Sequence, residues 1–454
     1  MSLLLVGMDV TIVNVALPAI EHDLHATFEG LQWIVDAYTL VVASLLMLAG
    51  SISDRYGRRR VFQTGLCVFT SGSLLCSVAP SIGWLIAFRV FQGLGASMLN
   101  PVALSIIANT FKERKARARA IGIWGAVSGL SLAAGPLLGG ALTESIGWRA
   151  IFWINVPIGI LAFVLAAKFV PESRAARARA LDPVGQALLL FALASLTYAV
   201  IEGPRADWHS GLIIGLFVFC AVLLVSFLLY EPSREEPLLD LRFFRSTPFS
   251  AAIVTALCAF ACFAAFLFLN ALYLQQERGV SAFQTGLYTL PLAVFLMVCA
   301  PLSGRLVGSH GPRPSLLASG LGFLISAALL TQLGPETPFW LLTASYVSFG
   351  IALGMVNPAI TNNAVAGMPL AQAGVAAAIA STGRQVGAAL GVAIAGTVAS
   401  ANAATHGTDF GRATQPVWWG MVGCSVAILL LGWGSTTESA RATAERFAHS
   451  FEAA

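Results

Sequence analysis

Apolar stretches about as long as a bilayer-spanning helix run through this sequence from end to end. Such a helix needs roughly 20 apolar residues, and only helices or closed barrels satisfy their backbone hydrogen bonds inside a bilayer. The pattern therefore predicts an all-α, polytopic membrane protein with fourteen spans. The predicted spans lie near residues 3–20, 32–52, 62–79, 84–108, 120–143, 150–170, 182–202, 210–230, 249–272, 285–303, 315–333, 339–360, 375–400 and 417–435.

Composition supports the same class and excludes others. Of the 454 residues, 57% are hydrophobic and 11% are charged, whereas a soluble domain carries about 25% charged residues. These values exclude a soluble enzyme, a disordered protein and a disulfide-rich secreted domain. HExxH, CxxC and GxxxxGK[ST] patterns are absent, so the sequence predicts no metal site, no cofactor and no ATP-driven pump. No basic block with interleaved aromatic residues indicates nucleic-acid binding.

Cationic residues predict the orientation of the spans. If the N-terminus is cytoplasmic, the outer connections hold only Arg149, Arg205, Arg278 and Arg412, and two more cations, Arg89 and Arg384, are embedded in spans. The remaining twenty of the 26 lysines and arginines fall in cytoplasmic connections. Because cytoplasmic loops are enriched in Lys and Arg, this bias predicts that both termini are cytoplasmic. Residues 3–20 lack the basic leader of a signal peptide, so we interpret them as the first span.

A repeated turn suggests two halves. Gly50 and Gly57 recur at the same separation as Gly304 and Gly311, each pair following the second helix of a six-helix group. Duplicated six-helix halves place a transport site at the repeat interface. The predicted domains are an N-terminal bundle, an extra helix pair with its linkers, a C-terminal bundle and a cytoplasmic tail. Their bounds are 1–170, 171–236 (helices 182–202 and 210–230), 237–435 and 436–454.

Ionisable residues at membrane depth are costly, so each one is a candidate functional residue. Asp9 lies in the first span, where loss of solvation favours a neutral acid that can load and release a proton; alternatively, it lies at a frayed helix start. Asp36 either lines a cavity or occupies the first turn of the second span, where the helix dipole favours an anion. Arg89 shares one face of the fourth span with Gln92 and Asn100, and its guanidinium must face water, an acid or carbonyl groups.

Four motifs together resemble the major facilitator superfamily, specifically its fourteen-span drug:proton antiporter branch. They are Met8-Asp-Val-Thr-Ile-Val-Asn-Val-Ala-Leu-Pro18, the turn from Gly50 to Arg60, the stretch Leu85–Ser97 around Arg89, and Ala133-Ala-Gly-Pro-Leu-Leu-Gly-Gly140. The resemblance implies two six-helix bundles plus a central helix pair, in a bacterial cytoplasmic membrane.

The resemblance also implies roles for residues. Asp9 would couple protons or attract cationic drugs, and Arg89 would tune a carboxylate during proton transfer. The turn would act as a conformational latch through Gly50, Asp54, Gly57 and Arg58. The fifth span would form an antiporter hinge through Gly129, Gly135, Pro136, Gly139 and Gly140. For Arg384 we expect a structural hydrogen-bonding role ahead of a transport role.

The predicted function is export of lipophilic small molecules or drugs, cationic ones included, in exchange for protons by alternating access. The predicted partners are this small molecule, protons and the lipid bilayer. A proton symporter, or an exporter of one specific metabolite or antibiotic, is the alternative. A membrane-embedded enzyme is not supported, because no histidine lies within a span and no nucleophile–base pair is apparent.

Overall fold

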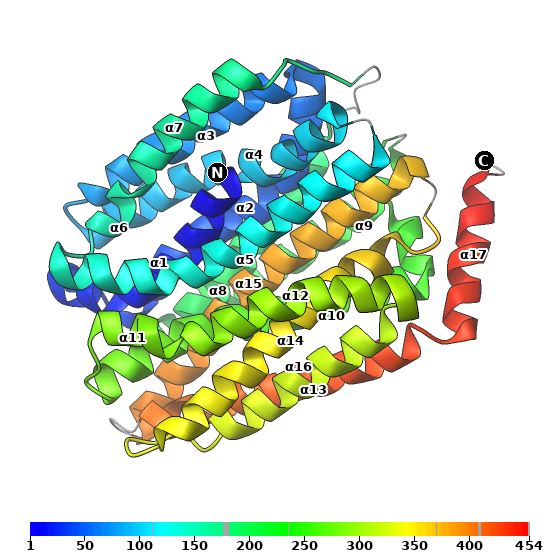
Figure 1. Cartoon of the computed structure of the whole chain (residues 1–454). Helices are drawn as coiled ribbons and strands as arrows, with labels where there is room; N and C mark the ends of the chain where they lie inside the picture. The colour runs from blue at the N-terminus through cyan, green and yellow to red at the C-terminus, as the bar shows by residue number, and fades with distance from the viewer. Residues whose placement is uncertain (112, 176–180, 235, 369, 407–409, 453–454) are drawn as a thin grey trace. The chain divides into compact units, whose positions relative to one another are not determined.

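The computed structural model describes residues 1–111, 113–175, 181–234, 236–368, 370–406 and 410–452, and this part of the chain is helical with no strand (Figure 1). It divides into two compact units, each described here by itself. Unit 1 comprises Met1–Leu238 and Asn270–Leu287. Unit 2 comprises Leu239–Leu269 and Tyr288–Ala454. The extra helix pair thus packs within unit 1, and the predicted domain bounds at 170 and 237 stay a prediction.

Unit 1 is built from neighbouring helix pairs: α1 packs on α5, α2 on α4 and α8, α3 on α4 and α7, and α8 on α9. The end of α10, the π-helix η3 and α11 also belong to it. The bounds are α1 Ser2–Leu24, α2 Phe28–Tyr56, α3 Arg58–Ser77, α4 Ile82–Thr110, α5 Arg114–Ser145, α6 Ala150–Trp153, α7 Asn155–Phe169, α8 Pro183–Ala206, α9 Gly211–Tyr230, η1 Glu231–Ser233, η3 Tyr273–Glu277 and α11 Ala282–Tyr288.

In unit 2, α14 packs on α12, α13 and α15, while α16 packs on α13 and α15. The C-terminal helix α17 lies against the short helix η2. The bounds are η2 Leu241–Arg245, α10 Thr247–Leu272, α12 Leu290–His310, α13 Arg313–Leu330, α14 Phe339–Val365, α15 Leu370–His406, α16 Phe410–Gly434 and α17 Glu438–Glu452. The predicted tail is therefore helical over most of its length.

Twelve helices of the described residues are long and apolar enough to cross a membrane, two fewer than the fourteen predicted spans. The predicted spans 62–79 and 120–143 correspond to α3 and α5. Both helices are long enough: about half of the residues of α3 are glycine, serine, threonine or arginine, whereas many side chains in the first half of α5 lie outside the described residues. Two predicted spans are each divided into two helices: α6 and α7 replace 150–170, and α11 and α12 replace 285–303.

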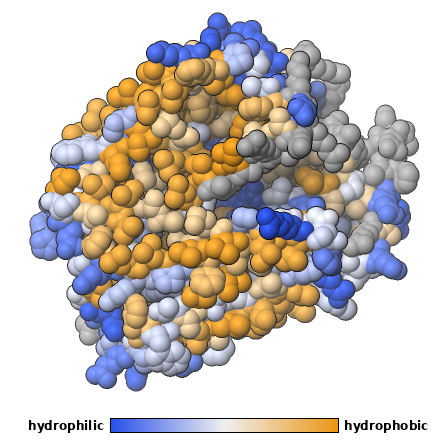
Figure 2. All heavy atoms as spheres, in the orientation of Figure 1, coloured by the Kyte–Doolittle hydropathy of each residue, from blue (hydrophilic) through white to orange (hydrophobic). Residues whose placement is uncertain are grey.

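Exposed side chains identify a hydrocarbon-facing surface. On α9 the apolar side chains of Leu212, Val218 and Leu229 are 58%, 57% and 75% exposed. A soluble protein rarely exposes a contiguous apolar face of this kind. Figure 2 shows apolar residues covering much of the visible helix surface, with many polar residues near its margins. The chain is thus a multi-pass membrane protein.

Helix ends follow local sequence signals. Thr27 accepts a hydrogen bond from the Gly30 amide at the start of α2, and Asp182 accepts one from the Gly185 amide at the start of α8. These contacts satisfy amides that a helix start leaves unpaired. Gly57 lies between α2 and α3 with φ +113°, a backbone conformation that favours glycine.

Candidate functional site

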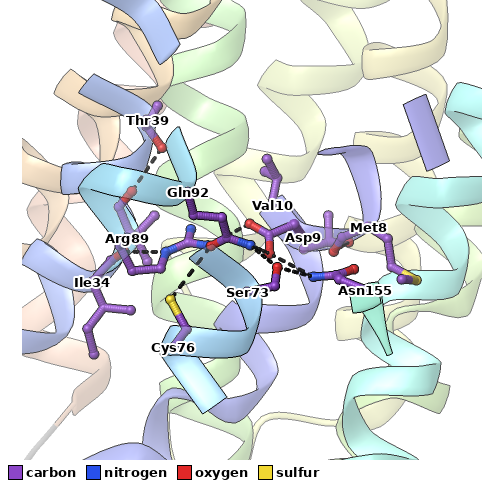
Figure 3. A network of polar contacts seen from close by, with 12 residues as sticks. Met8, Asp9, Val10, Ile34, Thr39, Ser73, Cys76, Arg89, Gln92 and Asn155 are labelled. Atoms are coloured by element: carbon purple, nitrogen blue, oxygen red, sulfur yellow. Dashed lines mark hydrogen bonds and ion pairs between the residues drawn. The ribbon is translucent and has the colours of Figure 1, made fainter. Parts of the chain in front are cut away.

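A buried polar cluster in unit 1 joins α1, α3, α4 and α7 around the carboxylate of Asp9 (Figure 3). Arg89 donates from Nη1 to Asp9 Oδ2 over 2.6 Å, and Gln92 donates from Nε2 to Asp9 Oδ1 over 2.9 Å. Asn155 donates from Nδ2 to the same Oδ1 over 3.3 Å. Gln92 Nε2 and Asn155 Nδ2 also reach Ser73 Oγ, at 2.6 and 3.3 Å. All five residues are at most 1% exposed.

Arg89 is held from further directions. Its Nη1 also donates to Gln92 Oε1 over 2.7 Å, and its Nε donates to the carbonyl oxygen of Ile34 on α2 over 3.0 Å. The guanidinium carbon lies 4.1 Å from the centroid of the Tyr38 ring. A guanidinium keeps its charge when buried, and it therefore needs acceptors and a π-face of this kind. Three side-chain donors stabilise Asp9 as the anion, so the cluster holds a charge-neutral ion pair.

Glycines allow the helices of this cluster to approach closely. A Cβ at Gly72 on α3 would lie 2.7 Å from the Cα of Gln92 on α4. A Cβ at Gly95 on α4 would overlap the backbone of Phe69, and one at Gly93 would lie 3.0 Å from a carbonyl oxygen of α2. Small residues of this kind are typical of helix contacts in membranes. They bring α4 close to α2 and α3, and Gln92 thereby reaches Ser73 of α3.

Two other predicted polar residues of unit 1 lie outside the cluster. Asp36 lies eight residues after α2 begins at Phe28, so it is not in the first turn of the helix. It is fully buried, and neither carboxylate oxygen has a hydrogen-bond partner among the described residues. Asn100 lies eight residues beyond Gln92 on α4, which places it about 12 Å further along the helix axis. Asn100 is half-buried, and its Oδ1 has no partner within the described ranges.

Arg384 lies on α15 in unit 2, and α15 packs closely against α10 beyond Arg384. A Cβ at Gly387 would lie 2.8 Å from the Cα of Leu257, and one at Gly391 would lie 2.6 Å from the Cα of Ala261. The buried Nη1 of Arg384 has no hydrogen-bond partner in the part of the chain that the structure describes. The structure therefore shows close helix packing here, but not the hydrogen bond from this nitrogen that a structural tether would use.

The predicted latch turn contains an ion pair. Arg58 Nη2 lies 2.6 Å from Asp54 Oδ1, and Gly57 makes the turn between the two helices. Gly50 has no atom within 4 Å of the position a Cβ would occupy, so close approach does not explain this glycine.

Glu172, in the segment after α7, was not predicted to be part of this turn. Its carboxylate accepts hydrogen bonds from the amides of Arg59 and Arg60, over 3.1 and 3.3 Å, and so caps the start of α3. The Glu172 carboxylate lies beside Gly57, a position whose φ of +113° already favours glycine. The turn is thus tied to the segment that follows the sixth predicted span.

The predicted hinge residues on α5 contact α1 and α11, all within unit 1. A Cβ at Gly135 would overlap Thr11, and one at Gly139 would lie 2.7 Å from Ile12 Cγ1. A Cβ at Gly140 would overlap Ala282 of α11. The remaining hinge residues, Gly129 and Pro136, lie on the same helix. The helix does not break at the Gly-Pro pair: α5 continues through Pro136 to Ser145, since proline removes one backbone donor and membrane helices tolerate this loss.

Sequence reasoning missed several members of the cluster. Asn155 donates a hydrogen bond to Asp9, and Ser73 accepts one from Gln92. The Cys76 thiol lies 3.9 Å from Gln92 Oε1. An asparagine within the apolar run 150–170 was the one signal that could have indicated Asn155.

A comparison with protein families identifies the chain. The sequence model of the Major Facilitator Superfamily matches residues 1–392. The chain belongs to this superfamily. Its members are transporters rather than enzymes, which agrees with the predicted all-α membrane transporter but does not confirm fourteen spans.

Relatives within the superfamily are resistance and efflux proteins. Multidrug resistance protein Stp of Mycobacterium tuberculosis strain H37Rv is 37% identical over 401 residues, 88% of this chain and 74% of that protein. The puromycin resistance protein of Streptomyces alboniger is 36% identical over 435 residues, 94% of this chain and 85% of that protein. The methylenomycin A resistance protein of Bacillus subtilis is 34% identical over 400 residues, 88% and 85% of the two chains.

Proposed function

We propose that this protein exports lipophilic small molecules, drugs among them, in exchange for protons. The observation that carries the proposal is a buried acid–guanidinium pair, Asp9 and Arg89, in a superfamily transporter whose relatives are drug and antibiotic resistance proteins. Proton entry would supply the free energy, since one charge that crosses 100 mV is worth about 2.3 kcal/mol. No cofactor is part of this proposal.

Protonation of Asp9 would act on the cluster through charge. The ionised carboxylate attracts Arg89 and accepts hydrogen bonds from Gln92 and Asn155. A proton on Asp9 removes that attraction and leaves the guanidinium charge uncompensated in an apolar site. The four helices that meet at the cluster then favour a different arrangement. Proton binding can thereby bias one conformation of an alternating-access cycle over another.

The proposal includes a membrane topology. All fourteen predicted spans would cross the bilayer, α3 and α5 included, in a bacterial cytoplasmic membrane with both termini cytoplasmic. The turn with the Asp54–Arg58 pair would act as a conformational latch on the cytoplasmic side. The close contact of α5 with α1 would serve as the hinge.

The test is transport in inside-out vesicles with a panel of dyes, quaternary amines and antibiotics. Acidification of the lumen should drive cargo accumulation by the wild-type protein, which a symporter would not show. Asp9→Asn should abolish this accumulation while cargo binding partly survives. Asp23→Asn is the matched control on the same helix, because Asp23 is 47% exposed on its side chain and pairs with Arg149 at the surface. Unchanged accumulation in Asp9→Asn would remove Asp9 from the mechanism.

Export of one specific antibiotic is a second candidate function. The relatives named for puromycin and methylenomycin A resistance favour it. The same panel separates the two functions, because a multidrug exporter moves chemically unrelated compounds and a dedicated exporter moves one.

A further inference from the structure

Unit 1 contains a second carboxyl group at membrane depth that the Asp9 cluster does not use. Asp36 on α2 is fully buried, and both of its oxygens lack a hydrogen-bond partner among the described residues. Asp36 also takes part in none of the ion pairs formed by the described residues. The environment of Asp36 is therefore the opposite of that of Asp9.

The helices packed against α2 bring charged groups to this level, but each of these groups has another partner. Arg89 on α4 bonds to Asp9 of α1 and to the Ile34 carbonyl. Glu202 on α8 accepts a hydrogen bond from Trp33 Nε1 over 3.0 Å and lies 3.8 Å from Arg205. On α3, the Cys76 thiol lies beside Gln92, and the cations Arg58, Arg59 and Arg60 are at the far end of that helix.

An ionised carboxylate without donors or a counter-ion is very costly in an apolar environment, and such a group takes up a proton instead. Asp9, with an arginine and two amide donors, is stable as the anion. In many acid–base sites two carboxyl groups lie in opposite environments, and one of them is protonated while the other is ionised. The structure assigns the bound proton to Asp36 and the negative charge to Asp9.

We propose that Asp36 is a second proton-binding carboxyl, which carries an exchanged proton and is occupied in this conformation while Asp9 is ionised. The exchange of this proton rests on the proposed antiport function, whereas its presence on Asp36 does not. The prediction differs from one in which Asp36 binds a cationic cargo directly, because a neutral, fully buried acid offers no charge to a cation.

Infrared spectroscopy of the purified full-length protein tests the occupancy. A protonated carboxyl in an apolar site gives a C=O stretching band that an ionised carboxylate lacks. Difference spectra at pH 7 between the wild type and Asp36→Asn should contain this band, whereas the difference between the wild type and Asp23→Asn should not. Difference spectra are needed because Asp182 and Glu231 are also buried carboxyl residues of unit 1. Absence of the band from the Asp36→Asn difference spectrum would overturn the proposal.

Accumulation in proteoliposomes tests the exchange. Each coupled proton contributes one decade of cargo accumulation per pH unit of gradient, because one pH unit corresponds to about 1.4 kcal/mol. Asp36→Asn should therefore lower the steady accumulation ratio about tenfold at a gradient of one pH unit, while Asp36→Glu keeps it. An unchanged ratio in Asp36→Asn would overturn the proposal. If the wild type accumulates no cargo, the antiport function fails, and the infrared band alone then decides whether Asp36 holds a proton.

Discussion

Removal of the guanidinium from the Asp9 cluster should reveal how much of the stability of unit 1 depends on the ion pair. In Arg89→Gln, the carboxylate of Asp9 loses the 2.6 Å bond to Arg89 and keeps only the amide donors Gln92 and Asn155. Breaking a buried pair by removing one partner typically costs about 3–5 kcal/mol. The loss has a ceiling, because Asp9 can take up a proton.

The ceiling follows from solution chemistry. Keeping neutral at pH 7 an aspartic acid that ionises in water near pH 3.9 costs about 4 kcal/mol, since each pH unit is worth about 1.4 kcal/mol. The expected loss in free energy of unfolding for Arg89→Gln is therefore about 3–4 kcal/mol at pH 7. Wherever Asp9 of the folded variant is protonated, this loss should shrink by about 1.4 kcal/mol for each unit by which the pH falls. The sign follows because the folded variant binds a proton that the unfolded chain does not, so acid favours the folded state.

The assay is reversible unfolding in mixed micelles, followed by tryptophan fluorescence, for Arg89→Gln, Asp9→Asn and the double variant. The double variant should be more stable than the sum of the two single losses predicts, because it leaves no uncompensated charge. Asp36→Asn is the control for the aspartate substitution, and it should cost little because an amide replaces a neutral acid. A loss below about 1 kcal/mol for Arg89→Gln would refute the buried ion pair.

Two further substitutions test the latch turn and the α1–α5 contact. Gly139→Ala should destabilise the protein by about 1–3 kcal/mol in the same unfolding assay, because the added Cβ meets Ile12. Gly308→Ala has open space within α12 and should leave the stability unchanged or raise it by up to about 1 kcal/mol. Asp54→Asn should slow cargo turnover in vesicles without changing which compounds are carried, because Asp54 pairs with Arg58 at the turn. An altered set of carried compounds would instead place Asp54 at the cargo cavity.

Much of the helical layout could be predicted, because a span is a local property of the sequence. Each predicted apolar run corresponds to a helix or to two consecutive helices in the structure. The repeated turn was also predictable: Gly57 and Gly311 both have positive φ and separate consecutive helices. The number of spans follows less directly from hydropathy, since α3 carries polar and small residues that serve contacts between helices.

The site was predictable only along single helices. Arg89 and Gln92 lie one turn apart, so helical periodicity places them on one face. Ser73 and Asn155 are far from them in sequence, and their contacts depend on how α3, α4 and α7 pack. A single sequence contains no direct signal for such packing. The same limit applies to Glu172, which reaches the start of α3 from a connection more than a hundred residues away.

The opposite states of Asp9 and Asp36 have a consequence for coupling. In this conformation the membrane-depth part of α1, α2 and α4 carries no net charge, because Arg89 balances Asp9 and Asp36 is neutral. A cation that entered this environment would add an uncompensated charge, and the penalty falls if Asp36 gives up its proton. A neutral cargo would gain nothing from that release. Charge balance alone would therefore favour release of the Asp36 proton when a cationic cargo enters, and not when a neutral cargo of the same size enters. This effect needs no direct contact between Asp36 and the cargo.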